Sequence, residues 1–403
     1  MDKKIWAIAI VAVLIVAGAA TYVVVSSNDD DDISYDSGAT NIIARVNSEG
    51  SGLFISSHLL DPSASTPTRA SNGIQFFDSD YKITSANADA WGGLVFGDPG
   101  ASSIQHTQLA SIAAAAGLGF KQYTATTILS NNTLYYHTNL SNYGTIVAAG
   151  DIDGGIIWEP QYQRVIQEES AKYTKLALTN DLFPGHTCCV IAGNHNWLEN
   201  NSDTAARFLA GYVDGVNFLT AALDNKTSDD YAWLVNFAKT NMASGTLSES
   251  EVKAAFDSIT YLYADDSAGS LNKLTGDIES LATSLSDLGL ITSSKFSTDD
   301  AQAFAEAFVD DSYLKNAVSK DFDTSSSRSV NVAVINGDIH QIAIQIAVEK
   351  KFFDSYRINV TLNSSASSGG DIATLLTSGD TNIGFLGAPP ATTYAINGEH
   401  ILV

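Results

Sequence analysis

The chain has 403 residues, and its 45 acidic residues against 21 Lys and Arg give a formal net charge of -24. Such a charge makes binding to a phosphate backbone unfavourable, which argues against nucleic acid as a partner. The hydrophobic share of 45% is ample for packed cores and excludes a disordered chain. The two cysteines are the neighbours Cys188 and Cys189, which cannot build a disulfide framework. Burial must therefore hold the fold together.

The first predicted element is an apolar helix over residues 5 to 25, which would span about 31 Å and could cross a membrane. Lys3 and Lys4 precede this run and an acidic run at residues 29 to 32 follows it, so the positive-inside rule places the rest of the chain outside the cell. A cleaved signal peptide is the alternative, because small residues at 17 to 20 resemble a cleavage site. The apolar run continues to residue 25, and this favours an uncleaved anchor.

A polar stretch over residues 26 to 40 predicts a solvated tether. Six Asn-x-Ser/Thr acceptors are compatible with an external surface, although a chain rich in Asn and Ser also contains such triplets by chance. They lie at Asn131, Asn139, Asn200, Asn225, Asn359 and Asn363.

Short β-type runs then alternate with helical ones, which predicts α/β layers with a largely parallel sheet. The predicted strands are 42–46, 52–56, 94–96, 156–158, 176–178 and 189–192, with an Ala-rich helix over 105–116. From Asp203 the apolar spacing is helical for over a hundred residues, and Ser248 with Glu251 forms a capping-box pattern.

A second polar stretch over residues 319 to 329 predicts a linker, beyond which strands and helices alternate again. The expected elements are strands 330–335, 359–362, 382–386 and 401–403, and helices 341–351, 371–378 and 392–397. The chain therefore ends on a strand, and such a sheet needs another segment to complete it.

This last part of the chain carries a family resemblance. It reads VNVAVINGDIHQIAIQIAVEKKFFDSYRINVTL and then GGDIATLLTSGDTNIGFLGAPPATTYAINGE. Together these segments are similar to the amino-terminal half of the substrate-binding proteins of nitrate/sulfonate/taurine-type ABC importers. At the turn that begins with Lys351, this chain has Tyr356 and Arg357 where the family more often has Gly.

The rest of that family's sequence is similar to residues 41 to 318. The matching segments are ARVNSEGSGLFI, WGGLVFGDPGASSIQHTQL, AAGDIDGGIIWEPQYQRV, PGHTCCVIAGN and LGLITSSKFS with AFVDDSYLKNA. The family's first half thus comes last, which predicts a circular permutation. A tandem array with a truncated second copy and a domain swap between neighbouring chains are the alternatives. Another open point is that residues 41–46 and 400–403 both resemble the same family strand.

The resemblance implies an α/β fold of the two-lobed periplasmic-binding-protein-like type II, which closes around a ligand by hinge motion. After the anchor and the tether, the resemblance implies five further parts of the chain. They are 41–90 in lobe 1, 91–186 in lobe 2, 187–318 as the return to lobe 1 with its terminal helices, the linker 319–329, and 330–403 in lobe 1.

Several motifs fall where loops leave the carboxyl ends of strands, which is where ligands bind in open α/β sheets. Ser102 and Ser103 precede the helix that contains His106, so a helix start and two hydroxyls are available for an anionic group. An ordinary helix cap is an equally good interpretation of these serines.

The other ligand-binding candidates follow from the resemblance, and each has a structural alternative. Gly387, Ala388 and Pro389 form a strand-to-helix turn, where small residues allow close backbone approach to a ligand or simply start a helix. Asn47, Glu49 and Ser51 lie in the loop after the first strand, which either binds ligand or caps. His340 either faces the cleft or lies in the core, and Trp158 with Glu159 either gives an aromatic wall or closes a strand.

His186, Cys188, Cys189 and His195 are soft metal ligands by type. Adjacent cysteines on a strand should point to opposite faces, so we expect no metal site, and no cofactor is expected either. The zincin, phosphate-loop and nucleophile-elbow motifs are not found in the sequence.

The sequence therefore predicts a membrane-anchored extracellular receptor that is not an enzyme. It would capture a small anionic or zwitterionic solute of the sulfonate, taurine, nitrate or thiamine-precursor class. Its partners would be an ABC permease and its ATPase. The alternatives are an enzyme of the thiamine-pyrimidine synthase type and a surface sensory module.

Overall fold

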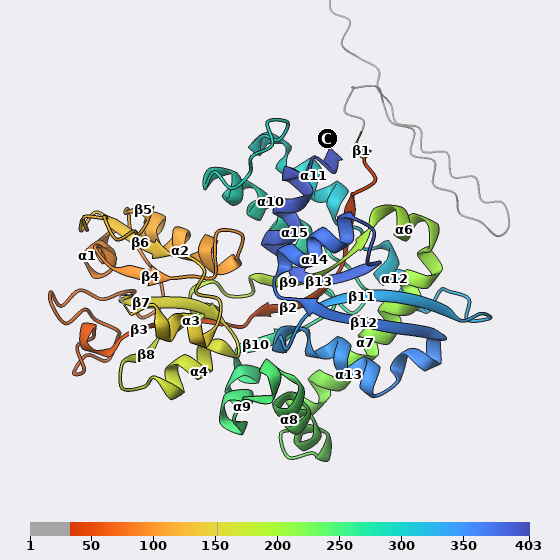
Figure 1. Cartoon of the computed structure of the whole chain (residues 1–403), viewed down its shortest axis with the longest axis horizontal. Coiled ribbons are helices and arrows are strands. Elements are labelled where there is room, and N and C mark those ends of the chain that lie inside the picture. The colour runs from red at the N-terminus through yellow and green to blue at the C-terminus, as the bar shows by residue number, and fades with distance from the viewer. Residues whose placement is uncertain (1–32, 151) are drawn as a thin grey trace, which may run out of the picture.

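Two six-stranded sheets, each covered by helices, divide the protein into two lobes (Figure 1). The computed structural model describes residues 33–150 and 152–403. Lobe 1 is the larger and contains the strands from both ends of the described chain, whereas lobe 2 is built from one continuous part of it.

The sheet of lobe 1 has the strand order β10-β2-β9-β13-β11-β12. Strands β11, β12 and β13 are parallel, whereas β2, β9 and β10 join the sheet through antiparallel pairs. The bounds are β2 (Thr40–Glu49), β9 (Thr187–Asn194), β10 (Ile259–Tyr261), β11 (Arg328–Ile335), β12 (Ile358–Ala366) and β13 (Ile383–Gly387).

Helices cover both faces of this sheet and enclose one large apolar core. The longest, α7, packs against α12 and α13, and Ser248 caps α9 with the predicted capping box. The bounds are α6 (His195–Asn200), α7 (Ser202–Asp224), α8 (Asp229–Asn241), α9 (Glu249–Ser258), α10 (Asn272–Asp287), α11 (Ala301–Phe308), α12 (Ser312–Ser319), α13 (Ile342–Glu349), α14 (Gly369–Thr377) and α15 (Ala388–Asn397).

The sheet of lobe 2 has the order β5-β6-β4-β7-β3-β8, with one apolar core on each face. Its strands are β3 (Ser51–Ser56), β4 (Val95–Gly97), β5 (Gly119–Gln122), β6 (Thr133–His137), β7 (Gly154–Trp158) and β8 (Tyr173–Leu178). Its helices are α1 (Ala88–Trp91), α2 (Ile104–Ala115), α3 (Tyr143–Ala148) and α4 (Gln161–Glu168).

Both sheets are mixed, so the prediction of a largely parallel sheet was wrong. The reason is that β2, β3 and β9 carry the chain between the lobes and run antiparallel to their neighbours. The lobe boundary also differs from the expected one, because β3 pairs with β7 and β8 of lobe 2 although residues 41 to 90 were expected in lobe 1.

The two ends of the described chain pair with each other as β1 (Ser34–Tyr35) and β14 (Ile401–Leu402). Asp36 strengthens this ribbon, because its N–H donates to the His400 carbonyl at 3.1 Å and its carboxylate lies 2.9 Å from His400 Nδ1. Part of the stretch predicted as a tether is therefore a strand. Strand β14 is not part of the six-stranded sheet of lobe 1, in which β2 lies between β10 and β9.

The turn before β12 is made without glycine. Lys351 and Arg357 adopt positive φ angles of 60° and 53°, the left-handed region in which glycine is most common. The segment between α12 and β11, which was predicted as a linker, is held by Arg207 and Arg357, whose guanidinium groups donate to the carbonyls of Ser326 and Ser325.

Within residues 33–150 and 152–403, no helix combines the length and the apolar character that a membrane crossing needs. The predicted span over residues 5 to 25 lies outside the described residues.

Candidate functional site

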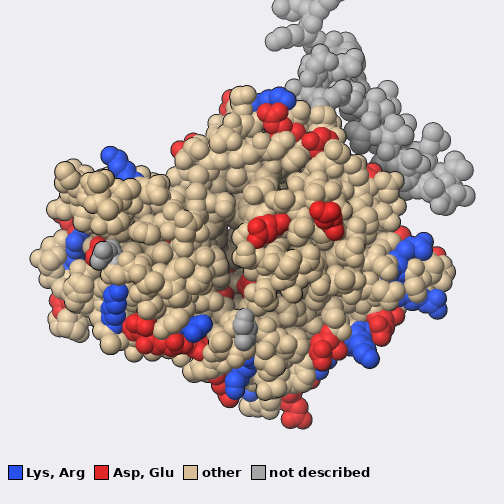
Figure 2. All heavy atoms as spheres, viewed as in Figure 1, with Lys and Arg blue, Asp and Glu red and all other residues tan. Residues whose placement is uncertain are grey.

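A cleft of about 280 Å³ lies where the two lobes meet, and Figure 2 shows the molecule hollowed between them. Helix α2 of lobe 2 forms one wall, while α10 and the start of α15 of lobe 1 form the other. The lining residues are Ile104, Thr107, Gln108, Ser111, Phe183, His186, Thr187, Asp277, Ile278, Ser280, Leu281, Ser284 and Ala388.

Helix α2 presents one stripe of side chains to the cleft. Ile104, Thr107, Gln108 and Ser111 recur at the three- and four-residue spacing that places side chains on one helix face. Ser103 fixes where this helix begins, because its Oγ accepts the His106 N–H at 3.1 Å and donates to the Gly100 carbonyl at 2.8 Å. Ser103 therefore sets the start of the helix whose stripe lines the cleft.

Gln108 carries an unsatisfied amide at the wall of the cleft. The residue is 3% exposed, and neither Nε2 nor Oε1 has a hydrogen-bond partner among the described residues. Leaving a buried polar group unpaired costs about 1–3 kcal/mol. A ligand that bonds to this amide would recover that free energy on binding.

His186 offers a hydrogen-bond acceptor at the same cleft. Its Nδ1 lies 2.7 Å from the Phe183 carbonyl oxygen, which can only accept, so Nδ1 carries the hydrogen. Burial lowers the pKa of His186, which favours the neutral ring. Its buried Nε2 has no partner among residues 33–150 and 152–403, and in this tautomer it carries a lone pair that can accept a hydrogen bond.

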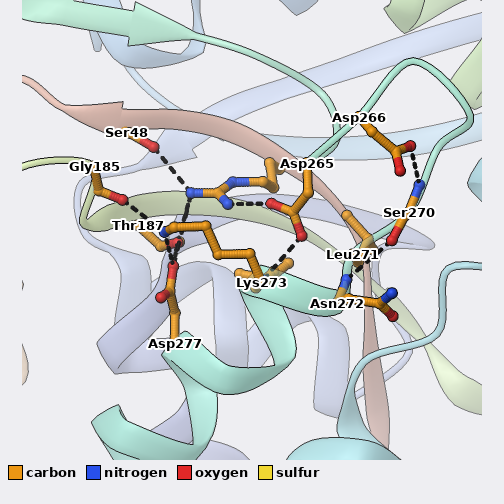
Figure 3. Close-up of polar contacts among 12 residues, drawn as sticks. Ser48, Gly185, Thr187, Asp265, Asp266, Ser270, Leu271, Asn272, Lys273 and Asp277 are labelled. Carbon is orange, nitrogen blue, oxygen red and sulfur yellow. Dashed lines mark hydrogen bonds and ion pairs between the residues drawn. The ribbon is translucent and has the colours of Figure 1, made fainter.

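Asp277 belongs to a charge cluster on α10 and the adjoining strands (Figure 3). Its carboxylate accepts from Thr187 Oγ1 at 2.6 Å and from Lys273 Nζ at 2.8 Å. Arg45, which is 1% exposed, lies 3.8 Å from the same carboxylate and forms an ion pair with Asp265. The cluster therefore holds two cations and two carboxylates, and its charges balance.

The start of α15 contributes few donors to the cleft. Ala388 lines the cleft as the first residue of the helix, Gly387 is the N-cap, and Pro389 and Pro390 follow. Proline has no backbone N–H, so two of the donors that a helix start normally offers are missing.

The predicted residues of the first motif in lobe 2 lie outside the lining. Ser103 is the N-cap of α2, and Ser102 is exposed. His106 is 3% exposed; its Nδ1 lies 2.9 Å from the buried Asp98 carboxylate, and its ring packs beside Phe120. The structure thus places His106 within lobe 2.

A second group of predicted residues gathers at the junction where β2 passes into β3. The Gly50 carbonyl oxygen is 2.9 Å from both the Glu159 backbone nitrogen and His340 Nε2. One donor comes from lobe 2 and the other from lobe 1. Glu49 ties the same point to the second crossover, because its carboxylate accepts from the Gly185 N–H at 2.8 Å and Asn180 Nδ2 at 2.9 Å.

Buried ionisable groups flank this junction. Burial raises the pKa of Glu159, whose carboxylate accepts from Ser258 Oγ at 2.8 Å and Gln163 Nε2 at 2.9 Å. Burial opposes the charged form of His340, but Asp338 and the other groups around the ring raise its pKa to about 9. Trp158, the neighbour of Glu159, is half-buried.

Asn47 and Ser51 complete the junction. Asn47 Nδ2 donates to the Glu49 carbonyl at 3.2 Å, and Ser51 Oγ accepts from Gln105 Nε2 at 2.8 Å. Of the twelve predicted residues, only Ala388 is among those that line the cleft, and the others stay predictions as ligand contacts. Sequence reasoning missed Gln108 and Asp277, and it considered His186 only as a metal ligand. The helical spacing along α2 could have pointed to Gln108.

The expectation that the two cysteines point to opposite faces was wrong. Their sulfur atoms are 3.6 Å apart, beside a register shift between β2 and β9 that breaks the regular alternation of side chains. His186 bonds to Phe183 as described, and His195 Nδ1 lies 2.8 Å from Asn41 Oδ1. In the part of the chain that the structure describes, no group of three His, Cys, Asp or Glu residues could hold a metal ion.

No family model matches the chain, and no curated protein sequence matches it. Among solved structures, the ligand-binding component of an ABC-type import system from Staphylococcus aureus, with zinc bound, is similar with a TM-score of 0.42 and 15% identity. The alignment covers 69% of this chain and 74% of that one. A likeness of this size does not by itself establish a common function.

Proposed function

We propose that this protein is a solute receptor that captures a small organic molecule between its lobes and delivers it to an ABC permease. The observation that carries the proposal is the cleft between the lobes, where the buried Gln108 amide has no partner among the described residues. The family resemblance of the sequence supports the same role. A receptor of this kind catalyses no reaction and needs no cofactor.

The connections between the lobes support a hinge. The chain passes between the sheets at Gly50 and again through α5 (Thr179–Leu182) and the residues before β9. Such short element-terminal segments can absorb the backbone rotation of domain closure. Ligand contacts to both walls would favour the closed state, which a permease could recognise.

The remaining parts of the proposal rest on the sequence. The first helix would anchor the receptor in the cell membrane with the lobes outside, and the order of the parts would be a circular permutation of the family's order. The solute class that the resemblance implies is anionic or zwitterionic, as for sulfonates, taurine, nitrate or thiamine precursors.

Small-angle X-ray scattering tests the central claim. The full chain in detergent is measured alone and with taurine, nitrate, an alkanesulfonate, thiamine, nicotinamide or ethanolamine at saturating concentration. At least one probe should reduce the radius of gyration and raise the melting temperature. Gln108→Leu should abolish both effects, whereas Gln302→Leu on the exposed surface of α11 should not. If no probe changes either quantity, the proposal is contradicted.

A further inference from the structure

We infer that the cleft selects a solute without an anionic group, either neutral or positively charged, which donates hydrogen bonds to His186 and Asp277 and presents an amide-like donor-acceptor edge to Gln108. This inference rests on the proposed function, because it assumes that the solute binds in this cleft. It departs from the anionic or zwitterionic class that the resemblance implies.

Hydrogen-bond acceptors dominate the polar part of the lining. His186 Nε2 is an acceptor in the tautomer that the Phe183 carbonyl requires, and the Asp277 carboxylate can only accept. Thr107 Oγ1 donates to the Ile104 carbonyl at 2.8 Å and Ser111 Oγ to the Thr107 carbonyl at 2.9 Å. Both hydroxyl hydrogens are thus used within the helix, and the hydroxyls offer lone pairs to a ligand.

The cleft has little to neutralise an anion. Its lining contains the Asp277 carboxylate and no Lys or Arg. The cations beside it are engaged: Lys273 bonds to Asp277 and to the Gly185 carbonyl at 2.9 Å, and Arg45 pairs with Asp265. Neither of these two cations is therefore free to pair with an anion.

The helix starts at the cleft do not replace the missing cations. Pro389 and Pro390 remove two N–H donors from the start of α15. At the start of α2, the Ser103 hydroxyl already accepts the His106 N–H. Helix N-termini are the usual backbone sites for anions, and here the two beside the cleft are depleted or capped.

Gln108 sets the shape of the polar contact. Its amide has a donor and an acceptor side by side in one plane, and both atoms are unpartnered among the described residues. A ligand amide, or a heterocycle with adjacent donor and acceptor atoms, satisfies both at once. Apolar side chains of Ile104, Phe183 and Leu281 would surround the organic body.

Three pairs of probes test this inference, and in each pair the second member carries an anionic group that the first lacks: nicotinamide with nicotinate, cytosine with orotate, and ethanolamine with taurine. Affinities for the full chain in detergent are measured by calorimetry at low salt and again at 0.15 M, where the expected order should persist. The member of each pair without the anionic group should bind at least about tenfold more tightly.

Three variants assign the effect to residues. Gln108→Leu should lower the affinity for nicotinamide and cytosine by about tenfold or more, because it removes both hydrogen bonds to the amide. Asp277→Asn should lower the affinity for ethanolamine and leave that for nicotinamide nearly unchanged, and Gln302→Leu should change neither affinity. Melting curves without ligand check that each variant is folded.

The outcomes separate the two proposals. Tighter binding of nicotinate, orotate and taurine, with compaction, overturns the inference about charge and supports the proposed function. Unchanged nicotinamide and cytosine binding in folded Gln108→Leu overturns the assigned contact. If no probe binds, the proposed function fails and the inference fails with it.

Discussion

His340 Nε2 lies 2.9 Å from the carbonyl oxygen of Gly50, although the two residues are 290 positions apart in the chain. The other ring nitrogen of His340 lies 2.8 Å from Asp338 Oδ1. Both partners are acceptors, so the ring can satisfy both only as an imidazolium that donates twice. A buried positive charge thus joins the first loop after β11 to the point where the chain crosses between the lobes.

This bond makes stability depend on pH. Because the folded state holds the His340 proton with a pKa of about 9, against 6.5 for a free histidine, the contribution is complete below pH 6.5 and is lost as pH rises through 9. The shift corresponds to about 3 kcal/mol. The unfolding free energy of the wild type minus that of His340→Gln should fall by that order between pH 6 and pH 10.

Urea unfolding at five pH values measures this difference. His58→Gln is the matched control, since His58 is exposed, and its difference from the wild type should stay constant. A pH-independent difference for His340→Gln would show that the imidazole is neutral and that one of its two bonds is absent.

Gly50 cannot carry a side chain without displacing the junction. A Cβ at this position would lie 2.4 Å from His340 Nε2 and 2.7 Å from Ile259 Cγ1, and the φ angle is +84°. Gly73 has a similar φ of +72° but nothing within 4 Å of a Cβ. Gly50→Ala should therefore destabilise the protein by about 2–4 kcal/mol, and Gly73→Ala by about 1 kcal/mol.

Thermal and urea unfolding of both variants separate the contact from the backbone strain. Equal losses would mean that the strained φ angle accounts for the whole effect and that the junction can move aside.

The sequence predicted the elements from β11 to α15 in their correct order, because β11 and β13 contain buried apolar runs, β12 begins with alternating apolar and polar residues, and each helix has a clear start or stop. It did not predict the cleft. Gln108 lies on α2, His186 in the loop before β9 and Asp277 on α10, and no local pattern relates them. The motif residues Glu159 and His340 do follow strand ends, as expected, but there they meet Gly50 rather than the lining of the cleft.

The same limit applied to the cysteines. Regular alternation along a strand would separate their side chains, and only the pairing with β2 creates the register shift beside them. Such shifts arise between strands that are distant in sequence, so a single strand does not reveal them.

Arg45 and Asp265 should be strongly coupled in the folded state, because removing one partner leaves the other charge buried without compensation. Arg45 is 1% exposed and also donates to Ser48 and Thr187 at 2.9 and 2.8 Å. Arg45→Met would leave the Asp265 carboxylate without its cation, at a cost of about 3–5 kcal/mol. Adding Asp265→Asn should recover part of that loss, because the uncompensated charge is then gone.

The exposed pair between Lys226 and Asp257 is the control for this experiment. Lys226→Met should cost at most about 1 kcal/mol, since exposed ion pairs contribute little. A double-mutant cycle, measured by urea unfolding, gives the coupling free energy between Arg45 and Asp265. A coupling free energy close to that of the exposed pair would contradict the prediction that Arg45 and Asp265 form a buried ion pair.

The pKa values of Glu159 and His340 are both raised, but the charged form of Glu159 opposes folding, whereas the charged form of His340 supports it. Burial raises the pKa of its carboxyl in the folded state, so its favourable contribution is present below the unfolded pKa, near 4.5, and is lost as pH rises through the folded pKa. The ionised carboxylate then costs free energy that an amide does not. From pH 5 to pH 8 Glu159→Gln should gain stability relative to the wild type, while the exposed Glu349→Gln should keep a constant difference from the wild type.

Glu159→Ala should be less stable than the wild type at every pH, by about 1–3 kcal/mol, because Ser258 and Gln163 lose their buried acceptor. A Glu159→Gln curve parallel to that of the wild type would place the ionisation of Glu159 outside this pH range.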